Sequence, residues 1–372
     1  MKPQYIIDGF TGTETIVNGK KYLYFAGTGY FQLNSHPELI KAASEATLKY
    51  GIATATSRAI TGNSHLLIEI EKKAADFFNT EDAVYLPSGY LTNIAGLQAL
   101  SELNTFDIIF LDDGAHYSLC EGARTVDKPL IFFNHCDTED LKQKLEQHLQ
   151  PGQRPLIASD GLFPIRAKIA PLETYLELAN NYDGTVWIDD AHGVGILGEN
   201  GRGTYEHLAL ESPRLYMGAT LSKAFGAYGG IIPGAARFIQ QIRSGSVMTG
   251  SSSPMHAAAA SGIKGLEIVQ QHPEMREKLW ANARYLKERM RSIGIQTEDN
   301  ELPIVAFSPG NMETMTKIHQ ALMEEGVYIQ FANYKGSGND GILRIVVFST
   351  HTQKQINLLT EKLGSAMRKF IS

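Results

Sequence analysis

An apolar run that ends in two carboxylates and an imidazole is the first sign of chemistry in this chain. The segment Val186-Trp-Ile-Asp-Asp-Ala-His-Gly193 passes from a strand-like pattern directly into Asp189, Asp190 and His192. An unpaired buried carboxylate is very costly, so it needs a cationic or protonated partner. A protonated heteroaromatic nitrogen suits Asp189, because the carboxylate and the charged ring stabilise each other. The alternative is an exposed aspartate that caps the next loop.

The glycines that follow match a dinucleotide-binding pattern in their spacing alone. Residues 193–198 read Gly-Val-Gly-Ile-Leu-Gly, but such a fingerprint must open a helix. The next residues, Glu-Asn-Gly-Arg-Gly-Thr at 199–204, predict a loop. A nicotinamide or flavin site is therefore not expected.

Lys223 stands at the end of another apolar run, in Thr220-Leu-Ser-Lys-Ala-Phe-Gly226. Its place between a hydrophobic strand and a glycine-rich stretch predicts that it is largely desolvated. Desolvation frees an amine to attack an aldehyde. Thr220 and Ser222 supply hydroxyl groups that can hold a phosphate beside it. A plain surface lysine after a strand is the alternative.

Ser88-Gly89-Tyr90 is a candidate phosphate cradle. It follows a strand pattern and precedes an apolar helical pattern. Small residues at a helix N-terminus expose backbone N–H groups to an anion, and Tyr90 would add a ring or hydroxyl contact. The alternative is an ordinary helix cap.

Two further residues, His116 and Arg344, have side chains that could bind a ligand. His116 follows an apolar run, where a flat imidazole can stack on an aromatic cofactor; a satisfied surface or core histidine is the alternative. Arg344 interrupts an apolar strand pattern. Its planar fork suits a substrate carboxylate, and an internal salt bridge is the competing explanation.

Short apolar runs alternate with helix-length segments through the middle of the chain, which indicates a mostly parallel sheet covered by helices on both faces. In such sheets, ligands bind beyond the carboxyl ends of the strands. Most of the polar sets described above directly follow a predicted strand. The predicted strands are Ala83–Leu86, Ile108–Leu111, Leu130–Phe133, Leu156–Ser159, Thr185–Ile188, Leu215–Ala219 and Gly230–Pro233.

The two ends of the chain have different patterns. Asn18-Gly19 between apolar runs predicts a hairpin, and the residues after 254 predict a long helical region followed by an αβαββα order. The latter order is typical of a smaller α+β domain. The predicted domains are an N-terminal extended and helical segment at 1–45, a large cofactor-binding α/β domain at 46–253, and a linker helix with the small domain at 254–372.

Bulk composition excludes several classes of function. The 372 residues carry 34 Lys and Arg against 40 Asp and Glu, a formal net charge of −6, without a dense basic run. Nucleic acid is therefore not an expected partner. Cys120 and Cys136 form no CxxC pair, so neither disulfides nor a metal site are predicted. With no signal-peptide pattern and no membrane-length apolar segment, a cytoplasmic protein is expected.

Together, Asp-Asp-Ala-His-Gly at 189–193 and Thr-Leu-Ser-Lys at 220–223 resemble fold-type I enzymes that use pyridoxal 5′-phosphate (PLP). The chain is most similar to the α-oxoamine synthases, a family that includes 8-amino-7-oxononanoate synthase, 2-amino-3-ketobutyrate CoA ligase and serine palmitoyltransferase. The resemblance runs from Tyr22 to Leu363. It implies a homodimer with shared active sites.

The resemblance also implies a role for each matching residue. Lys223 would hold PLP covalently and move a proton at the substrate α-carbon, Asp189 would pair with the pyridine nitrogen, and His116 would stack on the ring. Ser252 would reach the phosphate in a neighbouring subunit. The remaining cofactor contacts would come from Ser88, Gly89, Tyr90, Asp160, His192, Thr220 and Ser222.

Arg344, Arg58 and Thr28 are the residues that the resemblance places at the substrate, with Arg344 binding the amino-acid carboxylate. Thr28 stands where the family usually has an asparagine, and a hydroxyl donates and accepts differently from an amide. Ala53-Thr-Ala-Thr-Ser57 replaces a glycine-rich stretch. These departures leave the identity of the acyl donor open.

The expected function is condensation of a small amino acid with an acyl-CoA thioester, usually with loss of the carboxylate, to give an amino ketone. One alternative is a fold-type I aminotransferase or lyase that acts on a small amino acid. A second is a non-catalytic or carrier-protein-dependent subunit of a biosynthetic complex.

Overall fold

The structure is a computed structural model that describes residues 4–333 and 337–371. The chain forms two compact units. The large unit comprises His36–Phe163 and Ile169–Gln271, and the small unit comprises the residues before 36, Pro164–Lys168 and the residues from His272 onward.

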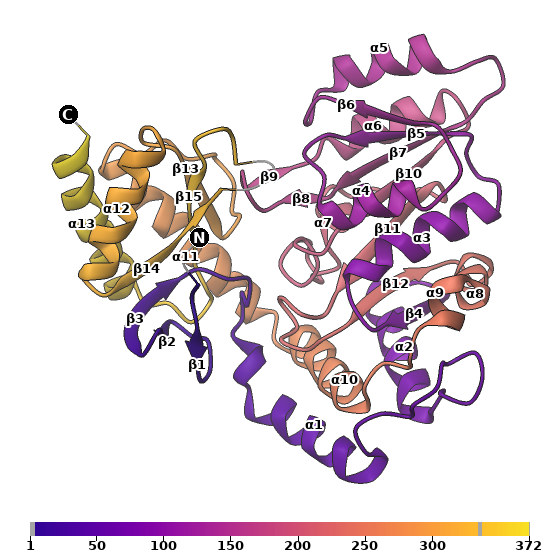
Figure 1. Ribbon diagram of the computed structural model, residues 1–372, viewed down its shortest axis with the longest axis horizontal. Helices are drawn as coiled ribbons and strands as arrows, with labels where there is room; N and C mark the ends of the chain where they lie inside the picture. Colours follow the sequence, from indigo (N-terminus) through magenta and orange to yellow (C-terminus); the bar gives the residue numbers. More distant parts are fainter. Residues whose placement is uncertain (1–3, 334–336, 372) are drawn as a thin grey trace. The chain divides into compact units, whose positions relative to one another are not determined.

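A seven-stranded sheet forms the centre of the large unit (Figure 1). Its strands all run parallel except β12, which lies antiparallel between β4 and β11. The prediction of a mostly parallel sheet is therefore confirmed. In spatial order the strands are β4 (Asp82–Leu86), β12 (Gly230–Gly234), β11 (Leu215–Thr220), β10 (Thr185–Asp189), β7 (Pro155–Asp160), β5 (Ile108–Asp112) and β6 (Leu130–Phe133).

Helices cover both faces of this sheet, as the apolar composition of its strands requires. All five residues of β10 and all five of β5 are buried, which is the pattern of strands enclosed on two sides. The short strands β8 (Leu162–Phe163) and β9 (Lys168–Ile169) follow β7 along the chain. The helices are α1 (Pro37–Tyr50), α2 (His65–Phe78), α3 (Tyr90–Glu102), α4 (Tyr117–Arg124), α5 (Thr138–His148), α6 (Leu172–Asn180), α7 (Thr204–His207), α8 (Ala236–Ser244), α9 (Ser246–Gly250) and α10 (His256–Gln271).

Helix α3 lies unusually close to the sheet. A Cβ atom at Gly96 would come within 2.0 Å of the Trp187 indole, so glycine at this position lets the helix backbone pack directly on the ring. Trp187 belongs to β10 and is fully buried. This contact holds the middle of α3 against the strand that ends in Asp189.

The small unit contains a six-stranded sheet with three helices. Asn18 and Gly19 both have left-handed backbone angles, with φ of 50° and 74°, which confirms the predicted hairpin. The predicted αβαββα order at the C-terminal end is also confirmed. In spatial order the strands are β1 (Ile7–Asp8), β2 (Glu14–Val17), β3 (Lys20–Phe25), β14 (Val327–Ala332), β15 (Ile342–Val346) and β13 (Ile304–Phe307), and the helices are α11 (Glu274–Ser292), α12 (Met312–Glu324) and α13 (Gln353–Phe370).

The compact units divide the chain at other positions than the predicted domains. Helix α1 packs against α10 within the large unit, where the rings of Tyr50 and His256 stack with centroids 4.6 Å apart. Strands β2 and β3 belong to the sheet of the small unit. The domain boundaries at 45/46 and 253/254 stay a prediction.

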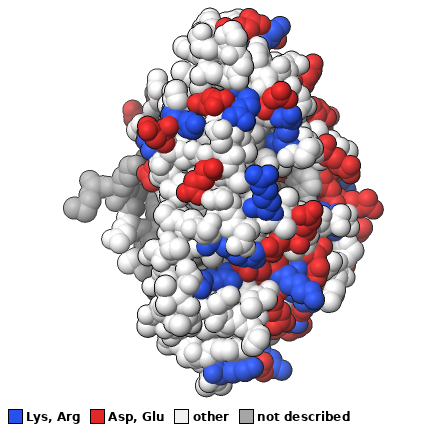
Figure 2. All heavy atoms as spheres, turned by 90° about the vertical axis from the view of Figure 1, so that its right-hand side faces the viewer, with Lys and Arg blue, Asp and Glu red and all other residues white. Residues whose placement is uncertain are grey.

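Charged side chains are interspersed on the face shown in Figure 2, where Lys and Arg lie among Asp and Glu. Such a mixture gives no extended basic track on this face. Among the helices of the described residues, none combines the length and the apolar composition that crossing a bilayer requires.

Candidate active site

Asp189 is the last residue of β10 and is buried, with 8% of its surface exposed. The amide Nδ2 of Asn93 donates a hydrogen bond to its Oδ2 at 2.6 Å. The backbone N–H of Ala191 donates to Oδ1 at 3.1 Å. Both carboxylate oxygens are thus held, and the side chain has one fixed orientation at the carboxyl end of the strand.

Asn93 of α3 links several residues of this region. The indole N–H of Trp187, which can only donate, bonds the Oδ1 of Asn93 at 2.8 Å. The amide NH2 must therefore face the other way, toward Asp189 and toward the Ser118 hydroxyl at 2.8 Å. Asn93 is completely buried. Sequence reasoning assigned it no role; a polar amide among the apolar positions of a helix was the available signal.

His116 precedes α4 and its side chain caps that helix. The ring Nδ1 faces both the backbone N–H of Ser118 at 3.3 Å and its hydroxyl at 2.7 Å. Because the backbone N–H can only donate, Nδ1 is an acceptor and the ring proton lies on Nε2. The ring is exposed and meets Tyr90 edge to face, with centroids 6.3 Å apart.

Asp160 ends β7 directly beside Asp189, since the two residues are register partners in the parallel pair. Burial raises its pKa well above the usual range, and the negative charge of Asp189 adds to this effect, while Lys223 acts in the opposite direction. The backbone N–H of His116 donates to its Oδ1 at 3.0 Å. Asp160 therefore lies among the predicted cofactor residues.

The predicted phosphate-binding residues of α3 and β11 meet in the structure. A Cβ atom at Gly89 would lie 2.7 Å from the Thr220 side chain, so a larger residue would fill the space at the start of α3. The Thr220 hydroxyl lies 2.9 Å from that of Ser222. Ser88 contacts the same turn through its hydroxyl, which accepts from the Tyr90 backbone N–H at 3.1 Å. A helix N-terminus and neighbouring hydroxyls form an anion-binding arrangement.

Lys223 follows β11 and is half-buried, which is less enclosed than the sequence pattern predicts. Because β11 runs parallel to β10 and β7, Lys223 follows it at the edge of the sheet where those strands end, and its charge acts on Asp160. His192 is half-buried in the turn after β10. Ser252 is exposed in the segment between α9 and α10.

Tyr90 is exposed, and its hydroxyl donates to the Glu121 carboxylate. Partial burial and this hydrogen bond raise the pKa of Tyr90 to about 12, so its phenol stays protonated at neutral pH. The Tyr90 hydroxyl is therefore engaged by Glu121, and the predicted cofactor contact of this residue is left to its ring.

Asp190 differs from its neighbour Asp189 in its surroundings and hydrogen-bond partners. It is completely buried and accepts hydrogen bonds from the Thr204 backbone N–H at 2.6 Å and from the Thr204 hydroxyl. Burial raises its pKa to about 7. A Cβ atom at Gly193 or Gly203 would come within 2.1 Å of its carboxylate, so these glycines form a tight loop around it. The predicted loop at 199–204 is confirmed up to Gly203, and α7 begins at Thr204; the glycines at 193–198 themselves open no helix.

Arg58 makes strong internal contacts. Its guanidinium binds both carboxylate oxygens of Glu71, at 2.5 and 3.1 Å, and also Asn63 Oδ1 at 2.9 Å. The Arg58 side chain is 7% exposed. Glu71 and Asn63 therefore satisfy the Arg58 guanidinium without any bound substrate. The substrate contact of Arg58 stays a prediction.

Arg344 and Thr28 belong to the small unit. Arg344 is buried in β15, donates from Nε to the Pro164 carbonyl at 2.8 Å and from Nη1 to Gln330 Oε1 at 2.9 Å. Its Nη2 is buried without a hydrogen-bond partner among the described residues, and no carboxylate of those residues pairs with it. A buried donor without a partner is costly. The arrangement suits an anionic ligand; Thr28 is half-buried in a bend after β3.

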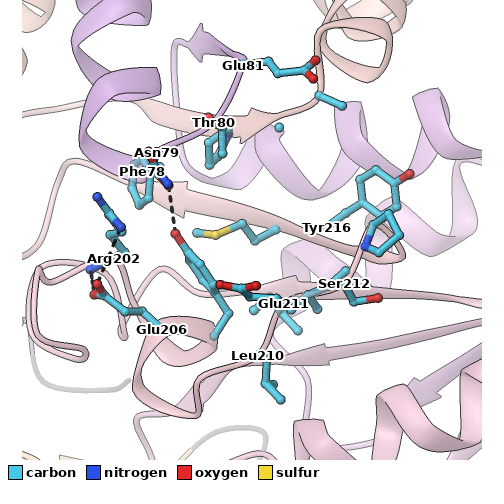
Figure 3. Close-up of a pocket in the computed structure, with 18 of the residues that line it drawn as sticks. Phe78, Asn79, Thr80, Glu81, Arg202, Glu206, Leu210, Glu211, Ser212 and Tyr216 are labelled. Atoms are coloured by element: carbon cyan, nitrogen blue, oxygen red, sulfur yellow. Dashed lines mark hydrogen bonds and ion pairs between the residues drawn. The ribbon is translucent and has the colours of Figure 1, made fainter.

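A cavity of about 680 Å³ in the large unit lies apart from these residues (Figure 3). It is lined by the end of α2, by α7 and by residues 209–213 and 215–217, and none of the predicted site residues lines it. The ion pair between Arg202 and Glu206, drawn as a dashed line in Figure 3, lies at its edge. These charges neutralise each other, so they create no unmatched binding group.

The residues of the large unit fit PLP on structural grounds. Asp189 is a buried carboxylate whose two donors are an uncharged amide and a backbone N–H, which leaves room for a charged ring nitrogen as its partner. Gly89 leaves space beside two hydroxyl groups at a helix N-terminus, as a phosphate requires. Lys223 follows β11, the parallel neighbour of β10, at the same edge of the sheet.

Comparisons with known proteins agree with this geometry. The model of the family described as "Aminotransferase class I and II" matches residues 26–363. An 8-amino-7-oxononanoate synthase from Alkaliphilus metalliredigens is 32% identical over 97% of this chain and 92% of that relative. One from Lysinibacillus sphaericus is 34% identical over 94% of this chain and 90% of that relative. A serine palmitoyltransferase from S. paucimobilis, solved with a bound PLP–myriocin aldimine, is 26% identical with a TM-score of 0.92, over 99% of this chain and 93% of that chain.

Proposed function

The chain belongs to the aminotransferase class I and II family, and from this premise we propose that it is a PLP-dependent α-oxoamine synthase. The reaction joins a small amino acid to an acyl thioester and releases an α-amino ketone, carbon dioxide and a free thiol. The observation that carries the proposal is the buried Asp189 carboxylate, held by Asn93 next to Asp160 and on the same side of the sheet as Lys223. The family model and the serine palmitoyltransferase structures confirm the fold class and the PLP cofactor that the sequence analysis predicts.

PLP, when bound, supplies an electron sink at the substrate α-carbon. The proposed role of Asp189 is to hold the ring nitrogen in its charged form, since a fixed carboxylate stabilises that charge. Lys223 would anchor the cofactor and then move the proton at the α-carbon of the amino acid. His116, whose ring proton lies on Nε2, would cover one face of the ring and present an N–H donor.

Arg344 is proposed to bind the carboxylate of the amino acid. Its buried Nη2 lacks a partner among the described residues, and a bidentate carboxylate would supply one. Thr28 is proposed to contact the substrate with its hydroxyl. Ser88, Gly89, Thr220 and Ser222 are proposed to hold the phosphate, together with Ser252 of a second copy of the chain.

The names of the relatives suggest the first substrates to test. 8-Amino-7-oxononanoate is an α-amino ketone whose amino-bearing carbon and methyl group correspond to alanine without its carboxylate. The rest of the molecule corresponds to a dicarboxylic acyl chain. We therefore propose alanine as the amino acid and an ω-carboxyacyl thioester as the acyl donor, carried by CoA or by a carrier protein.

Thiol release tests this reaction directly. The purified protein with PLP is mixed with a panel of acyl thioesters and with alanine, glycine or serine, and free thiol is measured together with carbon dioxide. We expect thiol release that requires the amino acid. If no pair in the panel releases thiol, or if an amino acid alone is converted to its keto acid, the proposal is wrong and an aminotransferase or lyase replaces it.

Lys223→Ala tests the assignment of the anchor. We expect the variant to lose the visible absorbance of covalently bound PLP and to lose thiol release by more than about 1,000-fold, because nucleophile and base are removed together. Lys354→Ala, at an exposed position in the first turn of α13, is the control and should keep both properties. An unchanged spectrum of Lys223→Ala would contradict the assignment.

A further inference from the structure

Asp112, His135 and Cys136 bring three different kinds of metal ligand together in the large unit. A carboxylate oxygen, a ring nitrogen and a thiol sulfur of these residues all lie within 4.8 Å of one another. None of the three has a place in the proposed PLP chemistry. The cluster has no motif in the sequence, because Asp112 lies more than twenty residues before the His-Cys pair.

Two neighbouring strands position the cluster. Asp112 is the last residue of β5 and is completely buried, and His135 and Cys136 form the turn that follows β6. Cys136 has a left-handed backbone with φ of 53°, a conformation that few residues other than glycine adopt. A Cβ atom at Gly114 would come within 2.4 Å of His135 Nδ1, so glycine there allows the imidazole to approach the end of β5.

His135 Nδ1 is near both of the other ligand atoms. It is 2.9 Å from Asp112 Oδ1 and 3.7 Å from Cys136 Sγ, and the same sulfur is 3.8 Å from Nε2 of the ring. With zinc bonds of about 2.1 Å to nitrogen and about 2.3 Å to sulfur, a separation of 3.7 Å between these atoms corresponds to an angle of about 115° at the metal, close to tetrahedral. The distance between His135 Nδ1 and Asp112 Oδ1 must lengthen by a few tenths of an ångström to reach a tetrahedral angle at the metal.

The charges of the cluster also favour a divalent cation. Asp112 is a buried carboxylate, and His135 is its one ion-pair partner among the described residues. Its other donors are the backbone N–H groups of Gly114 and Cys136 and the Tyr175 hydroxyl, which are all neutral. A carboxylate, a thiolate and a neutral imidazole together balance two positive charges.

We propose that Asp112, His135 and Cys136 form a binding site for a divalent cation of borderline softness, with zinc as the reference ion. The metal takes the place of the proton between His135 Nδ1 and Asp112 Oδ1, and the imidazole stays neutral with its one proton on Nε2. Cys136 binds as the thiolate and releases its proton to solvent. The three protein ligands leave a fourth position for water. The metal thereby joins the turn after β6 to the end of β5, four residues before His116.

Equilibrium dialysis of the PLP-loaded protein against zinc, in the presence of a non-thiol reductant, tests the site. The expected result is one zinc per chain in the unchanged protein, above the amount that Cys136→Ser retains. Cys136→Ser and His135→Ala should each weaken this binding by more than the 10- to 100-fold that loss of an outer-shell partner costs, since each removes a direct ligand. These substitutions affect half-buried side chains, so the fold should tolerate them.

The chain offers matched controls for both variants. Cys120→Ser removes the other cysteine, which is buried elsewhere, and His272→Asn removes an exposed histidine; both should keep the zinc. Zinc should also slow alkylation of Cys136, measured by mass spectrometry of its peptide. Absence of binding at tens of micromolar zinc, or equal binding in Cys136→Ser and the unchanged protein, would overturn the proposal. A Cys136 thiol that reacts with small disulfides at the same rate with and without zinc would overturn it as well.

Discussion

At the scale of single residues, the orientation of one buried amide organises the proposed cofactor site. The donor-only indole of Trp187 fixes Oδ1 of Asn93, and the two N–H groups of Asn93 then reach Asp189 and Ser118. Ser118 in turn faces Nδ1 of His116. Asn93 therefore positions the carboxylate that we propose for the ring nitrogen and, through Ser118, the imidazole that we propose for the ring face.

Asn93→Ala is expected to weaken PLP binding by about 10- to 100-fold, because Asp189 loses the donor that orients it. The measurement is a titration of the apo-protein with PLP, followed by visible absorbance. In the apo-protein, nitrogen NMR should show His116 with its proton on Nε2, and this preference should weaken in the variant. Asn181→Ala, at an exposed position after α6, is the control. Equal PLP affinity in Asn93→Ala and the control would refute the positioning role.

At the scale of elements, His351 joins β3 to the turn between β15 and α13. The Phe348 backbone N–H donates to its Nδ1 at 2.8 Å, so Nε2 carries the proton and donates to the Tyr24 carbonyl at 3.2 Å. The ring is stacked on Phe25 with centroids 4.1 Å apart and on Phe348 at 5.0 Å. Both nitrogens are satisfied in the neutral form, and burial lowers the pKa of His351 to about 3.

This shift predicts a loss of stability in acid. Below pH 6.5 the unfolded chain binds a proton at His351, whereas the folded chain does not until pH falls toward 3. The contribution of neutral His351 to the free energy of unfolding is therefore fully present above pH 6.5. It decreases by at most about 5 kcal/mol as pH falls toward 3. Denaturant unfolding from pH 7 to 4 measures it. His351→Asn keeps an acceptor near Nδ1 without titrating and should show a smaller pH dependence; an identical slope would contradict this account.

At the scale of the whole molecule, apolar side chains remain exposed on the large unit. Leu48 is 88% exposed, Ile52 70% and Ile60 75%, all within one stretch of sequence. Isolated exposed apolar residues are common, but several together indicate a protein interface. They agree with the homodimer that the sequence analysis expects.

Sedimentation equilibrium is expected to give twice the 40.9 kDa mass of one chain. Leu48→Glu introduces a charge on this exposed stretch and should weaken dimerisation at least tenfold, since a buried unpaired charge is costly. Leu358→Glu, at an exposed position of α13 in the small unit, is the control and should leave the mass unchanged. A monomer for the unchanged protein would contradict the expectation of a dimer.

The sequence alone determined the fold class and the cofactor. It also identified the strand ends that the candidate site residues follow. Apolar runs such as Thr185–Ile188 are readable because burial on two faces demands continuous hydrophobic residues. Polar residues that follow such runs must lie at one edge of a parallel sheet. Residue type and position along the chain were therefore enough to single out Lys223 and Asp189.

Only the tertiary structure decided which groups face each other. The two adjacent aspartates have different partners. Asp189 accepts a hydrogen bond from the Asn93 amide, whereas Asp190 accepts from Thr204 inside a tight glycine-containing loop. The tertiary structure also paired Arg58 with Glu71, and it placed Asp112 beside His135 and Cys136. These outcomes depend on packing between segments that are distant in the chain, and neither periodicity nor residue type records which distant side chains will meet.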